Sequence, residues 1–208
     1  MQVAGTGART GRVRVAVMIS GAGSNMAALI DAGLRPDAPF EVVLVLSNKA
    51  EAGGLAVAEA KGVAVAVINH GAFGKDRAAH EQAVQTVLDA HGVEVVALAG
   101  YMRLLTPFLV GRWAGRMLNI HPSLLPKYPG LDTHARAIAA GDAEAGCTVH
   151  LVTEGVDDGP VLGQAAVPVL ADDTPASLAQ RVLAAEHPLY PAALSDFCRA
   201  RLGKQRPK

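Results

Sequence analysis

Short apolar runs of strand length alternate with longer helical stretches over the first two thirds of the chain. The apolar runs cover residues 12–19, 42–46, 63–68 and 93–99, and the helical stretches cover 26–31, 54–61 and 75–91. The runs are apolar on both faces, which is typical of strands buried in a parallel sheet. This rhythm predicts a parallel sheet with helices packed on both of its faces.

The rhythm changes after Gly100. A short strand at 117–120 enters a loop at 124–132 that is rich in proline and glycine. Strands at 147–152 and 161–169 flank the turn Asp157-Asp158-Gly159, which predicts an antiparallel hairpin at the edge of the sheet. Thr174 and Pro175 then fit the cap and first position of a last helix that runs to about Cys198.

The predicted fold is therefore α/β: a Rossmann-like, mostly parallel twisted sheet with helices on both faces and a C-terminal antiparallel extension. We expect one domain over residues 13–200, preceded by a disordered N-terminal extension (1–12) and followed by a disordered tail (201–208). Gly33 is expected to cap the end of the first helix.

Composition narrows the class of protein. The 208 residues are 50% hydrophobic, and 19 basic side chains balance 19 acidic ones. This balance argues against a nucleic-acid partner, which usually demands a basic surface. No run reaches the ~18 apolar residues of a membrane span, and no secretory signal is present. The two cysteines have no metal-ligand spacing, so we expect a cytoplasmic protein without a metal.

A glycine-rich loop, Gly21-Ala22-Gly23-Ser24-Asn25, connects the first strand to the first helix. Backbone N–H groups at such a helix start bind phosphate. A dinucleotide site is disfavoured, because Met26 stands where the third glycine belongs and Ser47-Asn48 replaces the acidic residue that holds a ribose. A single phosphate is favoured, and a tight turn without ligand is the alternative.

Asn119 and His121 lie two residues apart at a strand end, so their side chains point the same way. A carboxamide can stabilise an oxyanion and an imidazole can transfer a proton near neutral pH. Asp157 follows in an acidic turn, and a carboxylate beside an imidazole favours the charged ring. A structural His-Pro turn and a surface Asp-Gly turn are the alternatives.

Other candidates carry weaker signals. The apolar segment Met102–Leu105 follows a strand end, where a flat apolar ligand would justify its exposure. His134 could line a site, and His150 is expected to be a core histidine that could also support the site. Trp113 is expected in the core, and three histidines are expected to be solvated: His70, His80 and His91.

These motifs together resemble the phosphoribosylglycinamide formyltransferase family, whose members use 10-formyltetrahydrofolate. The resemblance runs from about Val13 to Cys198. It rests on Ile19-Ser20-Gly21-Ala22-Gly23-Ser24-Asn25, Leu46-Ser47-Asn48-Lys49, Leu98-Ala99-Gly100-Tyr101-Met102-Arg103, the run Leu118-Asn119-Ile120-His121-Pro122-Ser123-Leu124-Leu125-Pro126-Lys127-Tyr128-Pro129-Gly130, and Val156-Asp157-Asp158-Gly159-Pro160.

The resemblance implies two small-molecule partners, 5'-phosphoribosylglycinamide and 10-formyltetrahydrofolate, and a monomer or homodimer. Gly23, Ser24 and Asn25 would hold the phosphate of the ribonucleotide, and Glu186 its ribose hydroxyls. Leu183, one turn earlier, departs from members that carry a polar or basic residue there. Asp132 replaces a histidine of some members.

For the folate, the resemblance implies contacts from Arg77 and from four consecutive residues, Met102, Arg103, Leu104 and Leu105. Asn119 would contact the formyl group, His121 would act as the catalytic acid, and Asp157 would keep that ring protonated. The alternatives are a formyltetrahydrofolate deformylase, a methionyl-tRNA formyltransferase, which is expected to need a further domain and a basic face, and a non-catalytic phosphometabolite-binding module on the same fold.

Overall fold

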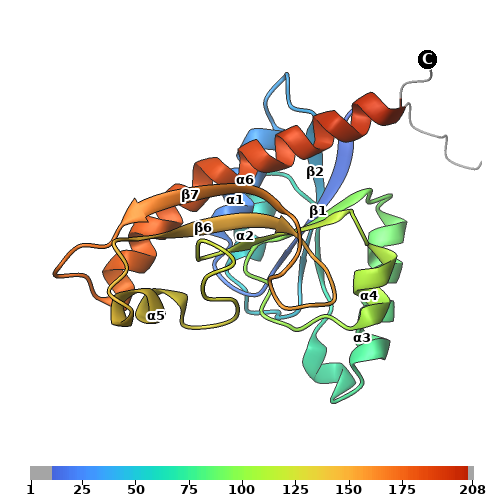
Figure 1. Cartoon of the computed structure of the whole chain (residues 1–208). Coiled ribbons are helices and arrows are strands. Elements are labelled where there is room, and N and C mark those ends of the chain that lie inside the picture. Colours follow the sequence, from blue (N-terminus) through green and yellow to red (C-terminus); the bar gives the residue numbers. More distant parts are fainter. Residues whose placement is uncertain (1–10, 206–208) are drawn as a thin grey trace, which may run out of the picture.

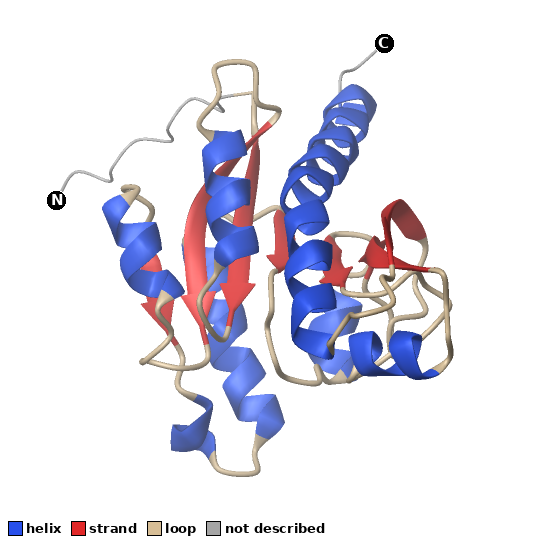
Figure 2. Cartoon of the chain, turned by 90° about the vertical axis from the view of Figure 1, so that its left-hand side faces the viewer, coloured by secondary structure: helices blue, strands red, loops and turns tan. Residues whose placement is uncertain are grey.

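The computed structural model describes residues 11–205, which form a seven-stranded sheet with helices on both faces (Figures 1 and 2). The strand order is β3-β2-β1-β4-β5-β6-β7. The first five strands run parallel, and β6 and β7 pair antiparallel at one edge. This confirms the predicted fold. The strands are β1 (Val13–Ile19), β2 (Phe40–Ser47), β3 (Val65–Val67), β4 (Val95–Leu98), β5 (Met117–His121), β6 (Glu144–Leu151) and β7 (Val161–Pro168).

Helices cover the sheet in two groups. The elements are α1 (Ser24–Gly33), α2 (Gly54–Ala60), the 3-10 turn η1 (His70–Phe73), α3 (Arg77–Ala90), α4 (Pro107–Arg112), α5 (Thr133–Ala139) and α6 (Pro175–Gln205). Side chains of α1, α2 and α6 pack on one face of the sheet, and those of α3 and α4 pack on the other.

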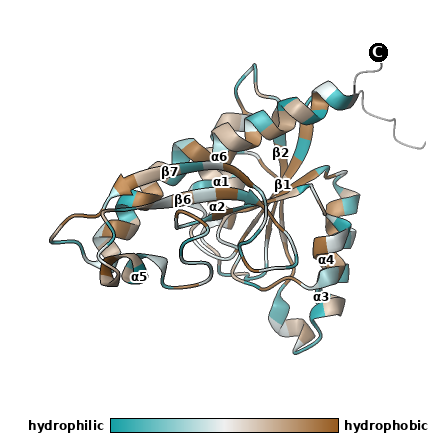
Figure 3. Ribbon diagram, viewed as in Figure 1, coloured by the Kyte–Doolittle hydropathy of each residue, from teal (hydrophilic) through white to brown (hydrophobic). Residues whose placement is uncertain are grey.

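Alternation along β1 divides its side chains between the two faces. Val15 and Val17 pack with α1, α2 and α6, whereas Ala16 and Met18 pack with α3 and α4. All four are fully buried, and the strands at the centre of the sheet are correspondingly hydrophobic (Figure 3). A third cluster joins α5, β6 and the start of α6.

The last helix is longer than the sequence predicts. It continues past Cys198 to Gln205, because Leu202 still packs against the core cluster under α1 and α6. Residues 201–205 are therefore helical and not disordered as predicted, and residues 206–208 lie outside the described part. At the other end residues 1–10 lie outside it, but Arg12 is held by the carbonyls of Gly33, Arg35 and Pro36.

Two short helices, α4 and α5, were not predicted. They are six and seven residues long, which is fewer than two turns each, so neither shows a helical period in the sequence. Gly33 is the last helical residue instead of a cap, and a Cβ there would lie 3.1 Å from the ring of Phe40. A larger residue here would have to displace the Phe40 ring slightly.

Candidate active site

The candidate site lies where the strand order reverses, at the carboxyl ends of β1 and β4. Loops that leave neighbouring strands in opposite directions open a crevice at such a point. Here the loops are bonded to each other: the Ser20 N–H donates to the Gly100 carbonyl at 3.1 Å, and the Met102 N–H donates to Ser20 Oγ at 2.8 Å. The glycine-rich loop and the apolar 102–105 segment are therefore neighbours.

Gly23 gives the first loop its shape. Its φ of +74° is left-handed, and a Cβ would lie 3.1 Å from the Cα of Gly54. A side chain would be strained there by both backbone conformation and crowding. Because α1 begins at Ser24, the first N–H groups of the helix have no partner within it. The loop thus has the geometry of an anion site.

Asn25 and Glu186 form a buried pair at the floor of this loop, with exposed fractions of 8% and 6%. Asn25 Nδ2 donates to Glu186 Oε2 at 2.5 Å across 161 positions of sequence. Burial raises the pKa of Glu186, although the hydrogen bond from Asn25 acts in the opposite direction. Among the described residues nothing donates to Asn25 Oδ1, which is also buried. The pair can therefore accept hydrogen bonds from a polar ligand.

Tyr190 fixes the helix that carries Glu186. It is fully buried, and its hydroxyl lies 3.1 Å from the Leu98 carbonyl and 3.2 Å from the Leu118 carbonyl. These carbonyls belong to β4 and β5, so one side chain ties α6 to both strands next to the crevice. Burial raises the pKa of Tyr190, which keeps its hydroxyl as a donor.

Asn119 lies beside His150 across the antiparallel β5–β6 pair. Its Nδ2 is 3.3 Å from His150 Nε2. His150 Nδ1 donates to the Leu151 carbonyl at 2.9 Å, and Nε2 lies between the Asn119 amide and Asp157 Oδ1, which is 3.5 Å away. His150 is buried, as expected of a core histidine, and its ring also contacts two of the candidate site residues, Asn119 and Asp157.

His121 is 95% buried at the end of β5 and contacts two acceptors. Its Nδ1 lies 3.2 Å from Asp157 Oδ2, and its Nε2 donates to the Tyr128 carbonyl at 2.9 Å. A ring with both nitrogens protonated satisfies an ionised carboxylate and a carbonyl at once. The imidazole and carboxylate predicted from the sequence are therefore brought together, with Asn119 on the same strand.

Asp157 is held in a left-handed conformation, with φ of +53°. Burial raises its pKa, but hydrogen bonds from His150 and the Gly130 N–H, together with the charge of His121, outweigh burial and leave the pKa below its usual value. The Gly130 N–H donates to Oδ2 at 2.9 Å. Two residues on, a Cβ at Gly159 would overlap the Leu151 carbonyl, so only glycine fits there.

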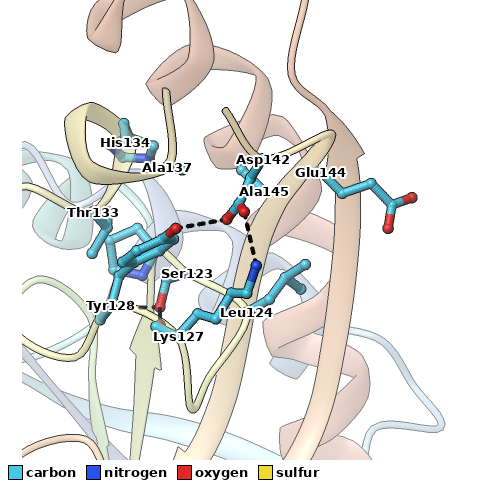
Figure 4. A pocket seen from close by; sticks show the side chains of 11 residues that line it. Ser123, Leu124, Lys127, Tyr128, Thr133, His134, Ala137, Asp142, Glu144 and Ala145 are labelled. Carbon is cyan, nitrogen blue, oxygen red and sulfur yellow. Dashed lines mark hydrogen bonds and ion pairs between the residues drawn. The ribbon is translucent and has the colours of Figure 1, made fainter. Parts of the chain in front are cut away.

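The segment 122–142 lies beside His121 and is held by hydrogen bonds between its own side chains. Lys127 Nζ and the Tyr128 hydroxyl both donate to Asp142, at 2.8 and 2.7 Å (Figure 4). Tyr128 has a left-handed φ of +56°, which directs its carbonyl to His121. His134 lines the small pocket beneath this network. Burial, followed by the charge of His121, lowers the pKa of His134.

The residues assigned to the folate lie after the carboxyl end of β4 and at the start of α3. Met102 and Leu104 are 67% and 69% exposed, whereas Arg103 and Leu105 are half-buried. Arg77, the first residue of α3, reaches across and donates from Nη2 to the Leu104 carbonyl at 2.5 Å. The side chains of Met102 and Leu104 are thus exposed to solvent, while the backbone of the same segment is hydrogen-bonded to Ser20 and Arg77.

One histidine was misplaced by the sequence analysis. His80 is buried instead of solvated, because Phe73 packs edge-on against its ring and its Nε2 bonds the Ile68 carbonyl. Burial lowers its pKa. Trp113 is buried as predicted. Within residues 11–205 no group of histidine, cysteine, aspartate or glutamate side chains is arranged to hold a metal ion. No helix of this part is long and apolar enough to cross a membrane.

Comparison with known proteins defines the class to which this fold and site belong. The profile of the family described as "Formyl transferase" matches residues 13–194. The chain belongs to the formyl transferase family.

Within that family the chain is similar to phosphoribosylglycinamide formyltransferases. It is 46% identical to the Escherichia coli (strain K12) protein of that name over 190 residues, which covers 91% of this chain and 89% of the relative. The crystal structure of phosphoribosylglycinamide formyltransferase from Brucella melitensis matches with a TM-score of 0.86 and 57% identity, over 90% of this chain and 96% of the other. These findings confirm the resemblance seen in the sequence.

A third relative is larger. The "Trifunctional purine biosynthetic protein adenosine-3" of Homo sapiens is 47% identical over 183 residues, which covers 88% of this chain. The chain spans only 18% of the length of that protein.

Proposed function

We propose that this chain transfers the formyl group of 10-formyltetrahydrofolate to the amine of 5'-phosphoribosylglycinamide, as a step of de novo purine biosynthesis. The observation that carries the proposal is the convergence of Asn119, His121 and Asp157 beside a phosphate-type glycine loop. The names of the relatives that match nearly the whole chain support this choice of substrates. We also propose a cytoplasmic location, because both substrates are charged, water-soluble metabolites.

The two ends of the crevice suit the two substrates. At one end, the N–H groups that begin α1 would hold the phosphate, and Asn25 with Glu186 would accept from the ribose hydroxyls. At the other end, the exposed side chains of Met102 and Leu104 would cover the flat ring system of the folate. Arg77 and Arg103 would add positive charge toward its carboxylates.

The bound folate supplies an electrophilic formyl carbon. Asn119 and the protonated His121 ring donate hydrogen bonds toward the negative charge that develops when the amine attacks, and each such donor typically contributes about 3 kcal/mol. His121 Nε2 now donates to the Tyr128 carbonyl, so the formyl oxygen must replace that carbonyl as the acceptor. Asp157, which lies against the other nitrogen of the ring, accepts the proton of the attacking amine through a water. The same relay delivers a proton to N10 as the C–N10 bond breaks, so that tetrahydrofolate leaves and the formyl group stays on the amine.

A formyl-transfer assay tests the proposal. The purified protein is incubated with 10-formyltetrahydrofolate in the presence and in the absence of 5'-phosphoribosylglycinamide, and tetrahydrofolate release is followed. We expect product only when the ribonucleotide is present. Equal product in both reactions would instead identify water as the acceptor and the protein as a deformylase, and no product in either would leave a binding module.

Ser24 provides a test of the phosphate site. Ser24 is exposed at the first position of α1, so Ser24→Glu places a carboxylate where the phosphate would bind. We expect ribonucleotide binding to be lost by charge repulsion, whereas Ser24→Gln, of the same size without charge, retains most of it. Equal affinity in both variants would locate the phosphate elsewhere.

A further inference from the structure

The backbone of residues 101–106 is held at three points, although the side chains of Met102 and Leu104 face the solvent. The Met102 N–H donates to Ser20 Oγ at 2.8 Å, and the Leu104 carbonyl accepts from Arg77 Nη2 at 2.5 Å. The Thr106 N–H donates to Glu81 Oε1 at 2.7 Å. An exposed apolar loop without such bonds would be free to collapse onto the surface.

Glu81 is the unusual member of this set, because it is a carboxylate with an exposed fraction of only 3% inside α3. A buried carboxylate is unfavourable unless hydrogen bonds or a counter-charge compensate it. Within the described residues no basic group forms an ion pair with it at 4.0 Å or less. Both of its oxygens are used by Thr106: Oε1 accepts the backbone N–H and Oε2 accepts the hydroxyl.

Thr106 makes these bonds in place of a hydrogen bond that would cap α4. It stands at the N-cap position of α4, where a threonine hydroxyl normally accepts from an N–H of the first helical turn. Its side chain makes no such cap bond, because the hydroxyl is turned toward Glu81. The local sequence therefore favours the link between α3 and the 101–106 segment over capping of α4.

Arg77 and Glu81 are four residues apart, and so lie on the same face of α3. Each bonds one end of the stretch that contains Leu104 and Leu105. Arg77 is exposed and is replaceable by solvent, whereas Glu81 is buried and its contact is protected from water. Of the two contacts, the one between Glu81 and Thr106 is therefore the better shielded from solvent.

We propose that Glu81 is a positioning residue of the formyl-donor subsite: through Thr106 it fixes the backbone from which Met102 and Leu104 contact the folate. The inference rests on the proposed function, which assigns this segment to the folate. Glu81 itself does not contact substrate. Its loss loosens the donor subsite and leaves the ribonucleotide subsite, on α1 and α6, in place.

Four variants separate positioning from a general effect on folding. Glu81→Leu removes both acceptors at similar volume. Glu81→Gln keeps both bonds, because its carbonyl accepts the Thr106 N–H and its amide donates to the hydroxyl. Thr106→Val removes only the hydroxyl bond. Gln82→Leu, at the exposed neighbouring position of α3, is the control for introducing a leucine.

Steady-state kinetics with both substrates and amide hydrogen exchange are measured on each variant. For Glu81→Leu we expect loss of exchange protection at Thr106 and a KM for the folate raised about tenfold, with the ribonucleotide KM within about twofold of wild type. Thr106→Val is expected to raise the folate KM by about threefold. Glu81→Gln and Gln82→Leu are expected to match the wild type.

An unchanged folate KM in Glu81→Leu, or equal rises in both KM values, would overturn the inference. If Glu81→Leu does not fold, Thr106→Val decides in the same way. If the wild type transfers no formyl group, the proposed function fails, and calorimetric titration with tetrahydrofolate then decides: weaker binding by Glu81→Leu than by Gln82→Leu supports the positioning role, and equal binding overturns it.

Discussion

Asp157 Oδ2 lies 3.2 Å from His121 Nδ1, although the two residues come from the loop before β7 and from the end of β5. The same oxygen accepts the Gly130 N–H, and the opposite nitrogen of the ring donates to the Tyr128 carbonyl. The imidazole is thus held between a carboxylate and a carbonyl. Both partners are acceptors, so a ring with a proton on each nitrogen, the form that can act as a general acid, would satisfy both.

Replacing Asp157 by asparagine should remove the charge that holds this proton. Asp157→Asn is expected to lower kcat by about 100-fold with little change in either KM, because proton transfer and not binding is impaired. Steady-state kinetics with both substrates measure this. Asp158→Asn, the exposed neighbour, is the matched control and should keep turnover near wild type. Turnover of Asp157→Asn close to that of the control would contradict the role of Asp157.

The two glycines of the phosphate-type loop, Gly21 and Gly23, should differ in their tolerance of a methyl group. Gly23→Ala puts a Cβ on a left-handed residue and 3.0–3.1 Å from Met26 Cε and Gly54 Cα, and should cost about 1–2 kcal/mol of unfolding free energy. It should also raise the KM for the ribonucleotide. Gly21→Ala meets nothing within 4 Å and should change neither quantity. Denaturant unfolding and kinetics on both variants check this, and equal stabilities would disprove the argument from conformation.

Glu186 should reduce the stability of the free protein. Because burial raises its pKa, the ionised form is disfavoured in the fold, and the cost is complete above the folded pKa and absent below the ordinary value of 4.5. Glu186→Gln should therefore raise Tm at neutral and alkaline pH, with the gain disappearing as the pH falls below 4.5. The same variant should bind the ribonucleotide more weakly. A Tm difference that does not depend on pH would rule out ionisation as the cause.

Asp173, in contrast to Glu186, should stabilise the fold when it is ionised. Bidentate hydrogen bonds from Arg181, at 2.6 and 2.9 Å, and one from the Leu170 N–H hold its pKa well below the usual range. Its contribution is complete above the ordinary value of 3.8 and is lost as the pH falls through the lower folded value.

We therefore expect Asp173→Asn to have a lower Tm than the wild type at neutral pH, and the gap to narrow in acid. Thermal unfolding across pH measures it. The exposed neighbour serves as control, since Asp172→Asn should shift Tm little at any pH. A gap that widens below 3.8 would show that the carboxylate is not the stabilising group.

The sheet could be predicted because its strands are buried on both faces and therefore read as continuous apolar runs, as in 13–19 and 95–98. The short helices α4 and α5 could not be predicted, although α2, of similar length, was. Thr106-Pro107 begins α4 with the same pair of residues as Thr174-Pro175 before α6, yet α4 is only six residues long and has no visible period. His80 was misplaced because burial by η1, a 3-10 turn, leaves no periodic signal.

In the site, strand alternation was enough to put Asn119 and His121 on one side, and the structure keeps them there. The pairing of Asn119 with His150 depends on the register of β5 against β6, which short strands do not specify in sequence. The contact of Asn25 with Glu186 joins α1 to α6, and the sequence did not predict it, since the family resemblance gave the two residues separate roles at the phosphate and at the ribose. The ligand-binding roles of these residues stay predictions until tested.

The position of Tyr190 on α6 bears on the spacing between this helix and the strands beside the site. It lies one turn after Glu186 on α6, between Pro188 and Pro191, where the helix lacks two of its own backbone donors. The phenol hydroxyl bonded to β4 and β5 holds α6 at this point, in addition to the apolar packing of its other residues. A slide of the helix along its axis would move Glu186 relative to β5, on which Asn119 lies, so this hydroxyl helps to fix the spacing between the two sides of the site.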